Sequence, residues 1–492
     1  MKGLWMISGI GKQMKYLICT LAIIFLFSNC THKVPRLNSK GEQQTEYTYQ
    51  LPEKIDGDWE ISSLEKEAVD SARIVKLIKN ILAGKFPNTH SVLLVKNGKL
   101  ILEEYFYGNK RDDLHYLASA TKSITSILIG ISLDQDFLTG VDQNASHWFN
   151  DYQNTNWISQ PYNITIRHLL SMTAGIDWDE KRSASDPKHD YFAMRRGGDW
   201  IRYVFNKDLV APPGQQFNYN GGLSALLGEI IKRASWIDAE KFSEKYLFEP
   251  LGISDYSWLK YNNGSINTGG GLLLRSRDMA KIGQVVLNNG MFKNKRIVSK
   301  KWIYESTKNH TLKWAHPFGS GYGYQWWLGE RIINGEKIRV VIAKGRGGQC
   351  IFVIPKANAI AVVTSQLRDN PGGYFRPQFM MTEYIIPALF PQASPKKNLA
   401  VDSVLLKKYV GKYEDRWFHL KASITIKDKK LIMVPHSWGG EMELFPTSET
   451  TFYGNLENIG NVEVNFSNDD NGSVDGMTMR IGFTHMLFDK IK

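Results

Sequence analysis

Hydrophobic and polar positions follow two different periods along residues 56–392. Two apolar runs, 92–95 and 100–102, are separated by Lys96-Asn97-Gly98-Lys99, and Asn-Gly between apolar runs predicts a β-hairpin. Further along the chain, apolar residues recur at the spacing of one helix face. The helices predicted in this way are 119–133, 166–172 and 223–231.

Two later apolar runs have the composition of strands. They are 338–342 and 351–364, and the second turns at 355–358. Strands at both ends, with helices between them, predict an α/β (α+β) fold. Its antiparallel sheet would be built from both ends of the domain.

The pattern changes after a break at 391–397, where Pro391 and Pro395 interrupt it. Short strand-like runs follow, most of them alternating, and they predict a small antiparallel all-β domain over 400–492, a barrel or a sandwich. The runs are 424–426, 431–434, 462–466 and 477–479, with Asn471-Gly472 and Asp475-Gly476 as the predicted turns.

The N-terminus carries an apolar stretch too short to cross a bilayer. Met14-Lys15 precedes this stretch at 16–27, and Ser28-Asn29-Cys30 follows it. This pattern predicts a secretory signal over 1–30 and resembles a bacterial lipoprotein signal, in which Cys30 is lipidated. Met14 is an alternative start to Met1, and an uncleaved membrane anchor is the alternative to cleavage.

The resemblance to a lipoprotein signal implies a place in the cell envelope. The lipid on Cys30 would hold the protein to a membrane, on the periplasmic or extracellular side. The polar stretch 31–55 is predicted to be the tether between this anchor and the folded domain.

Composition narrows the range of partners. Hydrophobic residues make up 42% and charged residues 22% of 492, which is typical of a globular protein. The net charge of +12 would suit nucleic acid, but Lys and Arg are scattered, so we predict a solvated surface and no nucleic-acid partner. No two histidines lie within four residues of each other, and we predict neither a metal nor a cofactor. Cys350 sits in an apolar run and is predicted to be buried and unpaired.

Candidate chemistry begins at Ser119 and Lys122. Their spacing puts both side chains on one face at the start of a predicted helix. A serine hydroxyl needs a base to become a nucleophile, and a desolvated lysine can serve as that base. The spacing alone is weak evidence, because Ser63 with Lys66 shares it. The alternative is a helix-capping serine followed by a surface lysine.

Two later stretches make the interpretation of Ser119 and Lys122 as a catalytic pair more specific. Pro213-Gly214 leads into Tyr219 and a predicted helix, and 343–349 is a glycine-rich approach to a strand. In this order the three motifs, over residues 60–390, resemble the serine β-lactamase-like superfamily. That superfamily includes class C β-lactamases, penicillin-binding-type peptidases and related esterases and amide hydrolases. Supporting stretches are 168–175, 269–272 and 321–327, and 400–492 resembles the β-barrel appendage of such hydrolases.

The resemblance implies a role for each matching residue. Ser119 is then the nucleophile, Lys122 its partner, and Tyr219 the group that passes a proton to the leaving group. The oxyanion hole would be formed by the backbone N–H groups of Ser119 and Arg346.

Two positions depart from the family pattern. Gly221 stands where the second motif has Asn, although Asn220 is adjacent. Ala343 stands where the third motif has Lys or His, and Lys344 and Arg346 could restore that charge. Together with Gly345, these residues are the predicted substrate-binding positions. Both departures favour an esterase, amidase or peptidase over an efficient β-lactamase.

The predicted function is therefore an acyl-enzyme hydrolase acting on a small molecule or a peptide. Ester or small-amide hydrolysis comes first, a D-amino-acid carboxypeptidase second and a β-lactamase third. A catalytically silent binding or sensor lipoprotein is the alternative from another class. We expect Gly269-Gly270-Gly271 to form a tight backbone approach near the active site. The aromatic stretch 321–327 suits a pocket wall and a core equally well.

Overall fold

The computed structural model describes most of the chain. The described residues are 44, 46–159, 162–182, 185–311, 321–333, 336–366, 375–391, 403–416, 420–436, 440–456 and 460–491. The predicted signal at 1–30, including Cys30, lies outside them, as does most of the tether. Within the described ranges, no helix is long and apolar enough to span a membrane.

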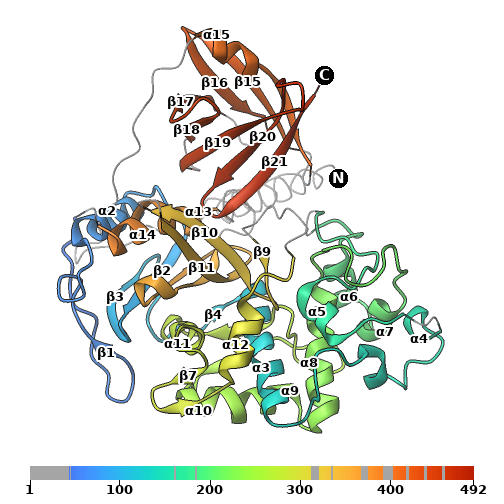
Figure 1. The fold of residues 1–492 in the computed structure, drawn as a ribbon. Coiled ribbons are helices and arrows are strands. Elements are labelled where there is room, and N and C mark those ends of the chain that lie inside the picture. Colours follow the sequence, from blue (N-terminus) through green and yellow to red (C-terminus); the bar gives the residue numbers. More distant parts are fainter. Residues whose placement is uncertain are drawn as a thin grey trace, which may run out of the picture.

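One mixed sheet forms the centre of the larger domain (Figure 1). Its strand order is β1-β3-β2-β13-β12-β11-β10-β9, with β1 parallel to β3 and every other neighbouring pair antiparallel. The hairpin β2–β3 turns at Asn97-Gly98 as predicted, and β2 pairs with β13 from the other end of the domain. The prediction of a sheet built from both ends is confirmed. The strands are β1 (Glu60–Ile61), β2 (Thr89–Lys96), β3 (Lys99–Tyr105), β9 (Gly321–Tyr322), β10 (Trp327–Ile333), β11 (Glu336–Gly345), β12 (Gln349–Ile354) and β13 (Ala359–Ser365).

Two smaller sheets accompany the main one. The first has the order β4-β6-β5 and the second pairs β7 with β8. Their strands are β4 (His115–Tyr116), β5 (Tyr256–Trp258), β6 (Leu272–Leu274), β7 (Met291–Phe292) and β8 (Lys295–Arg296).

Helices cover both faces of the main sheet and form a lobe beside it (Figure 1). α11 packs on one face, where a Cβ added to Gly283 would lie 2.7 Å from Ile360, so glycine permits the close approach. The α-helices are α2 (Ser71–Leu82), α3 (Thr121–Asp134), α4 (Asn156–Ser159), α5 (Ile166–Ser171), α6 (Asp190–Arg196), α7 (Trp200–Phe205), α8 (Gly221–Ser235), α9 (Ala239–Ser243), α10 (Glu249–Leu251), α11 (Ser276–Leu287), α12 (Lys300–Thr307), α13 (Arg376–Met380), α14 (Ile386–Leu389) and α15 (Ser403–Leu406). Short 3₁₀ or π turns are η1 (Ala118–Ala120), η2 (Ala145–Trp148), η3 (Glu244–Phe248), η4 (Pro355–Ala357), η6 (Met381–Ile385) and η7 (Lys407–Tyr409).

All three predicted helices are present, with shifted ends. The helix predicted over 119–133 begins as the 3₁₀ turn η1 and continues as α3. α5 ends at Ser171 because Met172 takes a left-handed conformation, with φ of 61°. α8 starts two residues earlier than predicted, since the Asn220 side chain accepts the Leu223 N–H at 3.1 Å and caps it.

The second half of the predicted tether packs on the sheet. The Tyr47 hydroxyl donates to Glu104 at 2.6 Å, and the Tyr49 hydroxyl donates to the Ile101 carbonyl at 2.8 Å. Tyr47 is buried. The two aromatic rings account for the packing, because they add apolar area to an otherwise polar segment.

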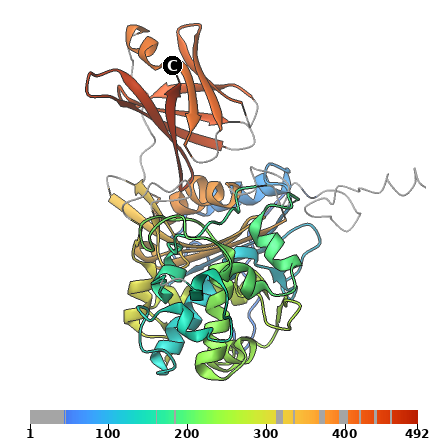
Figure 2. The same ribbon diagram turned by 90° about the vertical axis from the view of Figure 1, so that its right-hand side faces the viewer.

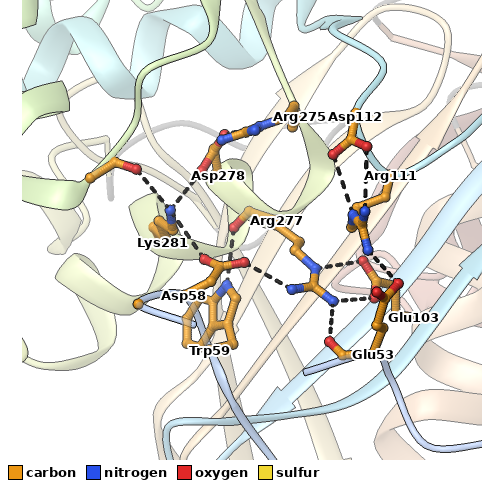
Figure 3. A network of polar contacts seen from close by, with 12 residues as sticks. Glu53, Asp58, Trp59, Glu103, Arg111, Asp112, Arg275, Arg277, Asp278 and Lys281 are labelled. Atoms are coloured by element: carbon orange, nitrogen blue, oxygen red, sulfur yellow. Dashed lines mark hydrogen bonds and ion pairs between the residues drawn. The ribbon is translucent and has the colours of Figure 1, made fainter. Parts of the chain in front are cut away.

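Buried ion pairs fix the residues before β1 to α11 and β3 (Figure 3). Arg277 of α11 contacts Glu103 of β3 at 2.6 Å and Asp58 at 2.9 Å, and Lys281 contacts Asp58 at 3.2 Å. The Arg277 side chain is only 4% exposed, and such a charge is tolerated only with compensating partners.

The C-terminal part is a closed antiparallel barrel, which confirms the predicted all-β domain. The turn predicted at Asn471-Gly472 is present, with φ of 78° at Gly472. The prediction of a turn at Asp475-Gly476 is wrong, because both residues lie inside β20. Glycine is needed there because a Cβ would lie 2.6 Å from the Phe488 carbonyl oxygen of the next strand. The strands are β14 (Gly411–Asp415), β15 (Lys421–Lys427), β16 (Lys430–Pro435), β17 (Met442–Pro446), β18 (Thr451–Leu456), β19 (Gly460–Asn468), β20 (Val474–Ile481) and β21 (Thr484–Ile491).

The turn between β20 and β21 anchors the barrel to the sheet domain. Phe483 at this turn is fully buried in the core of the larger domain, and its ring centroid lies 6.1 Å from that of Phe352. Its N–H donates to the Gln378 side chain at 3.2 Å. The barrel thus stands over the face that carries α2, α13 and α14 (Figure 2).

Replacing Phe483 by alanine should loosen this anchor. Loss of a fully buried ring costs about 3–5 kcal/mol, and urea unfolding followed by tryptophan fluorescence should show a loss of this size. Ile426→Ala is the control, because Ile426 is 38% exposed on the barrel. Equal stability of the two variants would contradict the anchor.

Candidate active site

The turn that carries Ser119 is strained and firmly held. Ala118, directly before it, is buried with φ of 47°. Such a conformation costs a non-glycine residue about 1–3 kcal/mol. The Leu117 N–H donates to the Leu272 carbonyl at 2.9 Å, which ties the turn to β6. Ser119 is half-buried and lies in η1, directly before α3.

Lys122 lies one turn further along, in contact with that hydroxyl. Its Nζ is 3.3 Å from Ser119 Oγ and donates to the Gly269 carbonyl at 2.5 Å. The residue is only 2% exposed, and burial lowers the pKa of Lys122 to about 8. A lysine with this pKa is partly neutral near pH 7–8 and can accept a proton.

The three glycines at 269–271 bring backbone close to this pair. A Cβ on Gly269 would lie 2.9 Å from the Gly221 carbonyl oxygen, and one on Gly270 would lie 2.8 Å from the Tyr191 hydroxyl. The predicted close approach of this stretch is confirmed, since side chains there would push its neighbours away.

Tyr219 lies close to Lys122, just before α8. Its ring centroid is 5.1 Å from Lys122 Nζ, and it stacks on Trp327 at 5.7 Å between centroids. Of the aromatic stretch 321–327, Tyr322 and Trp326 are buried core residues. Trp327 supports the Tyr219 ring, so the stretch serves both the core and the site.

The end of β11 lies against the Ser119 turn. A Cβ on Gly345 would overlap the Leu117 carbonyl oxygen and lie 3.2 Å from the Ala120 nitrogen. Ala343, two residues earlier, is fully buried on the same face of the sheet. The guanidinium of Arg346, which follows Gly345, is 5.9 Å from the Phe192 ring of α6.

Lys344 is not brought to Ser119. It lies opposite Cys350 in the β11–β12 pair, and side chains alternate along a strand, so it occupies the face opposite to Gly345. Burial lowers the pKa of Lys344 to about 8 and raises the pKa of the Cys350 thiol to about 12. Cys350 is buried and free, as predicted.

Asn220 and Gly221 both belong to the start of α8. Asn220 is 1% exposed, and its side-chain oxygen caps the helix. The Gly221 N–H donates to Glu180, and a Cβ on Gly221 would overlap the Tyr191 ring. The position where the family has a side chain has no room for one here.

Glu180 and Tyr191 are site residues that the sequence patterns did not identify. Glu180 accepts hydrogen bonds from the Gly221 N–H and from the Trp178 indole at 2.8 Å. The Tyr191 ring is 5.4 Å from Lys122 Nζ, and its hydroxyl accepts from Asn267 at 2.9 Å. Burial raises the pKa of both groups. Neither belongs to a recognisable motif, and only the fold brings them to Lys122.

The part of the chain that the structure describes holds no candidate metal site. There, no three His, Cys, Asp or Glu side chains are grouped so that they could hold a metal ion.

Known proteins resemble both parts of the chain. The beta-lactamase family model matches residues 76–380, and a domain of unknown function (DUF3471) matches residues 395–490. The 6-aminohexanoate-dimer hydrolase of Paenarthrobacter ureafaciens is 24% identical over 298 residues, which cover 57% of this chain and 73% of that one. Protein flp of Staphylococcus aureus (strain N315) is 29% identical over 204 residues, 39% of each chain.

A solved structure supports the same fold. The octameric penicillin-binding protein homologue from Pyrococcus abyssi aligns with a TM-score of 0.53 and 22% identity, over 85% of this chain and all of that one. The family model covers more than half of the chain. The chain belongs to the beta-lactamase family.

Proposed function

We propose that this protein is a serine hydrolase that cleaves esters or small amides through an acyl-enzyme on Ser119. The observation that carries the proposal is the contact between the Ser119 hydroxyl and a buried Lys122 of lowered pKa. The Paenarthrobacter relative is named a 6-aminohexanoate-dimer hydrolase, which supports small amides as a substrate class.

In the proposed first step, neutral Lys122 takes the hydroxyl proton while Ser119 Oγ attacks the carbonyl carbon. The N–H groups of Ser119 and Arg346 would hold the resulting oxyanion. As the C–O or C–N bond of the substrate breaks, Tyr219, next to Lys122 Nζ, passes its proton to the leaving alcohol or amine and regains one from the Lys122 ammonium. Water repeats the sequence on the acyl-enzyme, which releases the acid and restores Ser119.

The substrate choice is tested with a short-chain nitrophenyl ester, a nitroanilide, a D-alanyl-D-alanine peptide and nitrocefin. We expect turnover of the ester and the anilide, and the lowest kcat/KM for nitrocefin, since Gly221 provides no side chain to contact the lactam amide. Nitrocefin as the best substrate would contradict the proposal.

The pH dependence follows from the Lys122 amine. Because burial lowers its pKa to about 8, the neutral base is lost as pH falls below that value. We expect kcat/KM for the ester to rise with pH through about 8, tenfold per unit on the acid side. Rates that stay flat from pH 6 to 9, with the protein folded throughout, would exclude Lys122 as the base.

We also propose that the mature protein is lipid-anchored through Cys30 in the cell envelope. The support is the sequence pattern at 14–30 alone. Mass spectrometry of the mature N-terminal peptide tests it: a diacylglyceryl cysteine is expected, and an unmodified peptide that starts at another residue would overturn it.

A further inference from the structure

We propose that Glu180 is a positioning residue of this site. Its carboxylate would replace the side chain that Gly221 lacks and act as the electrostatic partner of the Lys122 ammonium. The proposal rests on the serine hydrolase function described above and goes beyond it, because it assigns the charge that controls the base.

The Glu180 carboxylate and Gly221 are matched in space. A Cβ on Gly221 would lie 2.8 Å from Glu180 Oε1, the same oxygen that accepts the Gly221 N–H. That oxygen also accepts the Trp178 indole N–H at 2.8 Å. Two donors, one in the loop before α6 and one at the start of α8, therefore fix the carboxylate where the family's Asn side chain would project. Glycine at 221 is the condition for this arrangement.

Lys122 and Glu180 influence each other across the site. Burial raises the pKa of Glu180, and the Lys122 charge opposes this. Burial lowers the pKa of Lys122, and the Glu180 charge opposes that in turn. Each group makes the charged form of the other more stable in a pocket that would otherwise favour neutral forms.

The other titratable groups near the pair do not replace this role. They are Tyr191, Tyr219, Tyr261, Tyr322 and His189. Burial raises the pKa of Tyr191, Tyr261 and Tyr322, so these three phenols stay neutral between pH 6 and 9. Glu180 is the carboxylate whose charge raises the pKa of Lys122.

The Glu180 carboxylate also acts during proton transfer. When Ser119 transfers its proton, the ammonium forms on Lys122 at the moment when the oxyanion forms on the substrate. A fixed carboxylate nearby stabilises that ammonium without any rearrangement. The same carboxylate holds the first N–H of α8, and so the position of Tyr219 just before that helix.

The test is the pH profile of Glu180→Gln. Glutamine keeps the shape and an acceptor oxygen but loses the charge, so the pKa of Lys122 should fall. We expect the acid limb of kcat/KM for the ester to move to lower pH by about one unit, with a lower rate at the plateau. A purely structural role would lower the rate at every pH and leave the limb in place.

Asp177→Asn is the matched control. Asp177 lies on the same loop and is exposed, and its substitution removes the same charge. The acid limb of kcat/KM for this variant should therefore stay at the wild-type pH. Circular dichroism shows whether each variant folds. If the glutamine variant does not fold, Glu180→Ala gives the same readout, because it leaves room for water at the Gly221 N–H.

The outcomes separate this proposal from the function on which it rests. A wild-type enzyme that hydrolyses none of the substrates overturns the hydrolase proposal. An active wild type whose limb does not move in a folded, uncharged Glu180 variant overturns the role of Glu180 alone.

Discussion

Ser119→Ala should lower kcat/KM for a short-chain ester by about 10⁴-fold or more. The expectation follows from the contact between this hydroxyl and Lys122 Nζ, which the substitution removes. Because alanine preserves the fold of the Ser119 turn, the loss should appear in the rate of chemistry and not in thermal stability. Steady-state kinetics on the purified variant measure it.

Ser63→Ala provides the matched control. Ser63 and Lys66 have the same spacing in sequence, but Ser63 Oγ accepts the Lys66 backbone N–H at 3.1 Å, and the Lys66 side chain is exposed. This variant should keep wild-type activity. Equal activity of Ser119→Ala and Ser63→Ala would remove Ser119 from the mechanism.

Gly221→Ala should cost about 10²-fold or more in kcat/KM, although it adds a single methyl group. That methyl group would overlap the Tyr191 ring and crowd the Glu180 carboxylate. Relief of the overlap has to move α6, which carries Tyr191, or the start of α8, next to Tyr219. Either shift displaces a ring that lies within 5.4 Å of Lys122 Nζ. Kinetics on the ester, with a melting curve to confirm folding, measure the effect.

Gly198→Ala is the control for this substitution. A Cβ on Gly198 meets no atom within 4 Å, so alanine should be tolerated there. Wild-type kinetics in Gly221→Ala would show that the space around Gly221 is not needed. Gly221→Asn should lose at least as much activity and should not create β-lactamase activity, despite restoring the family's residue.

The periodic parts of the fold were predictable from the sequence. The hairpin at Asn97-Gly98, the sheet from both ends and the all-β C-terminal domain each follow from local patterns. The errors lie at the ends of elements and at turns, where a single contact sets which residue begins or ends the element. Asn220 caps α8 two residues earlier than the apolar period indicates, and Gly476 pairs with Asp489 inside β20.

The candidate site was predictable only where motifs mark it. The order of motifs pointed to Ser119, Lys122 and Tyr219, and the structure places them around one amine. The sequence patterns did not identify Glu180, because its contact with Gly221 joins positions 41 residues apart. The side on which Lys344 lies depends on strand register, which the residue types at 343–345 do not reveal.

The central claim is that Ser119 is the nucleophile, and covalent labelling tests it most directly. The protein and its Ser119→Ala variant are incubated with a fluorophosphonate probe and with a labelled penicillin, and adducts are located by peptide mass spectrometry. We predict a fluorophosphonate adduct on the peptide that contains Ser119, absent from the variant. No adduct on Ser119 with either reagent would contradict it.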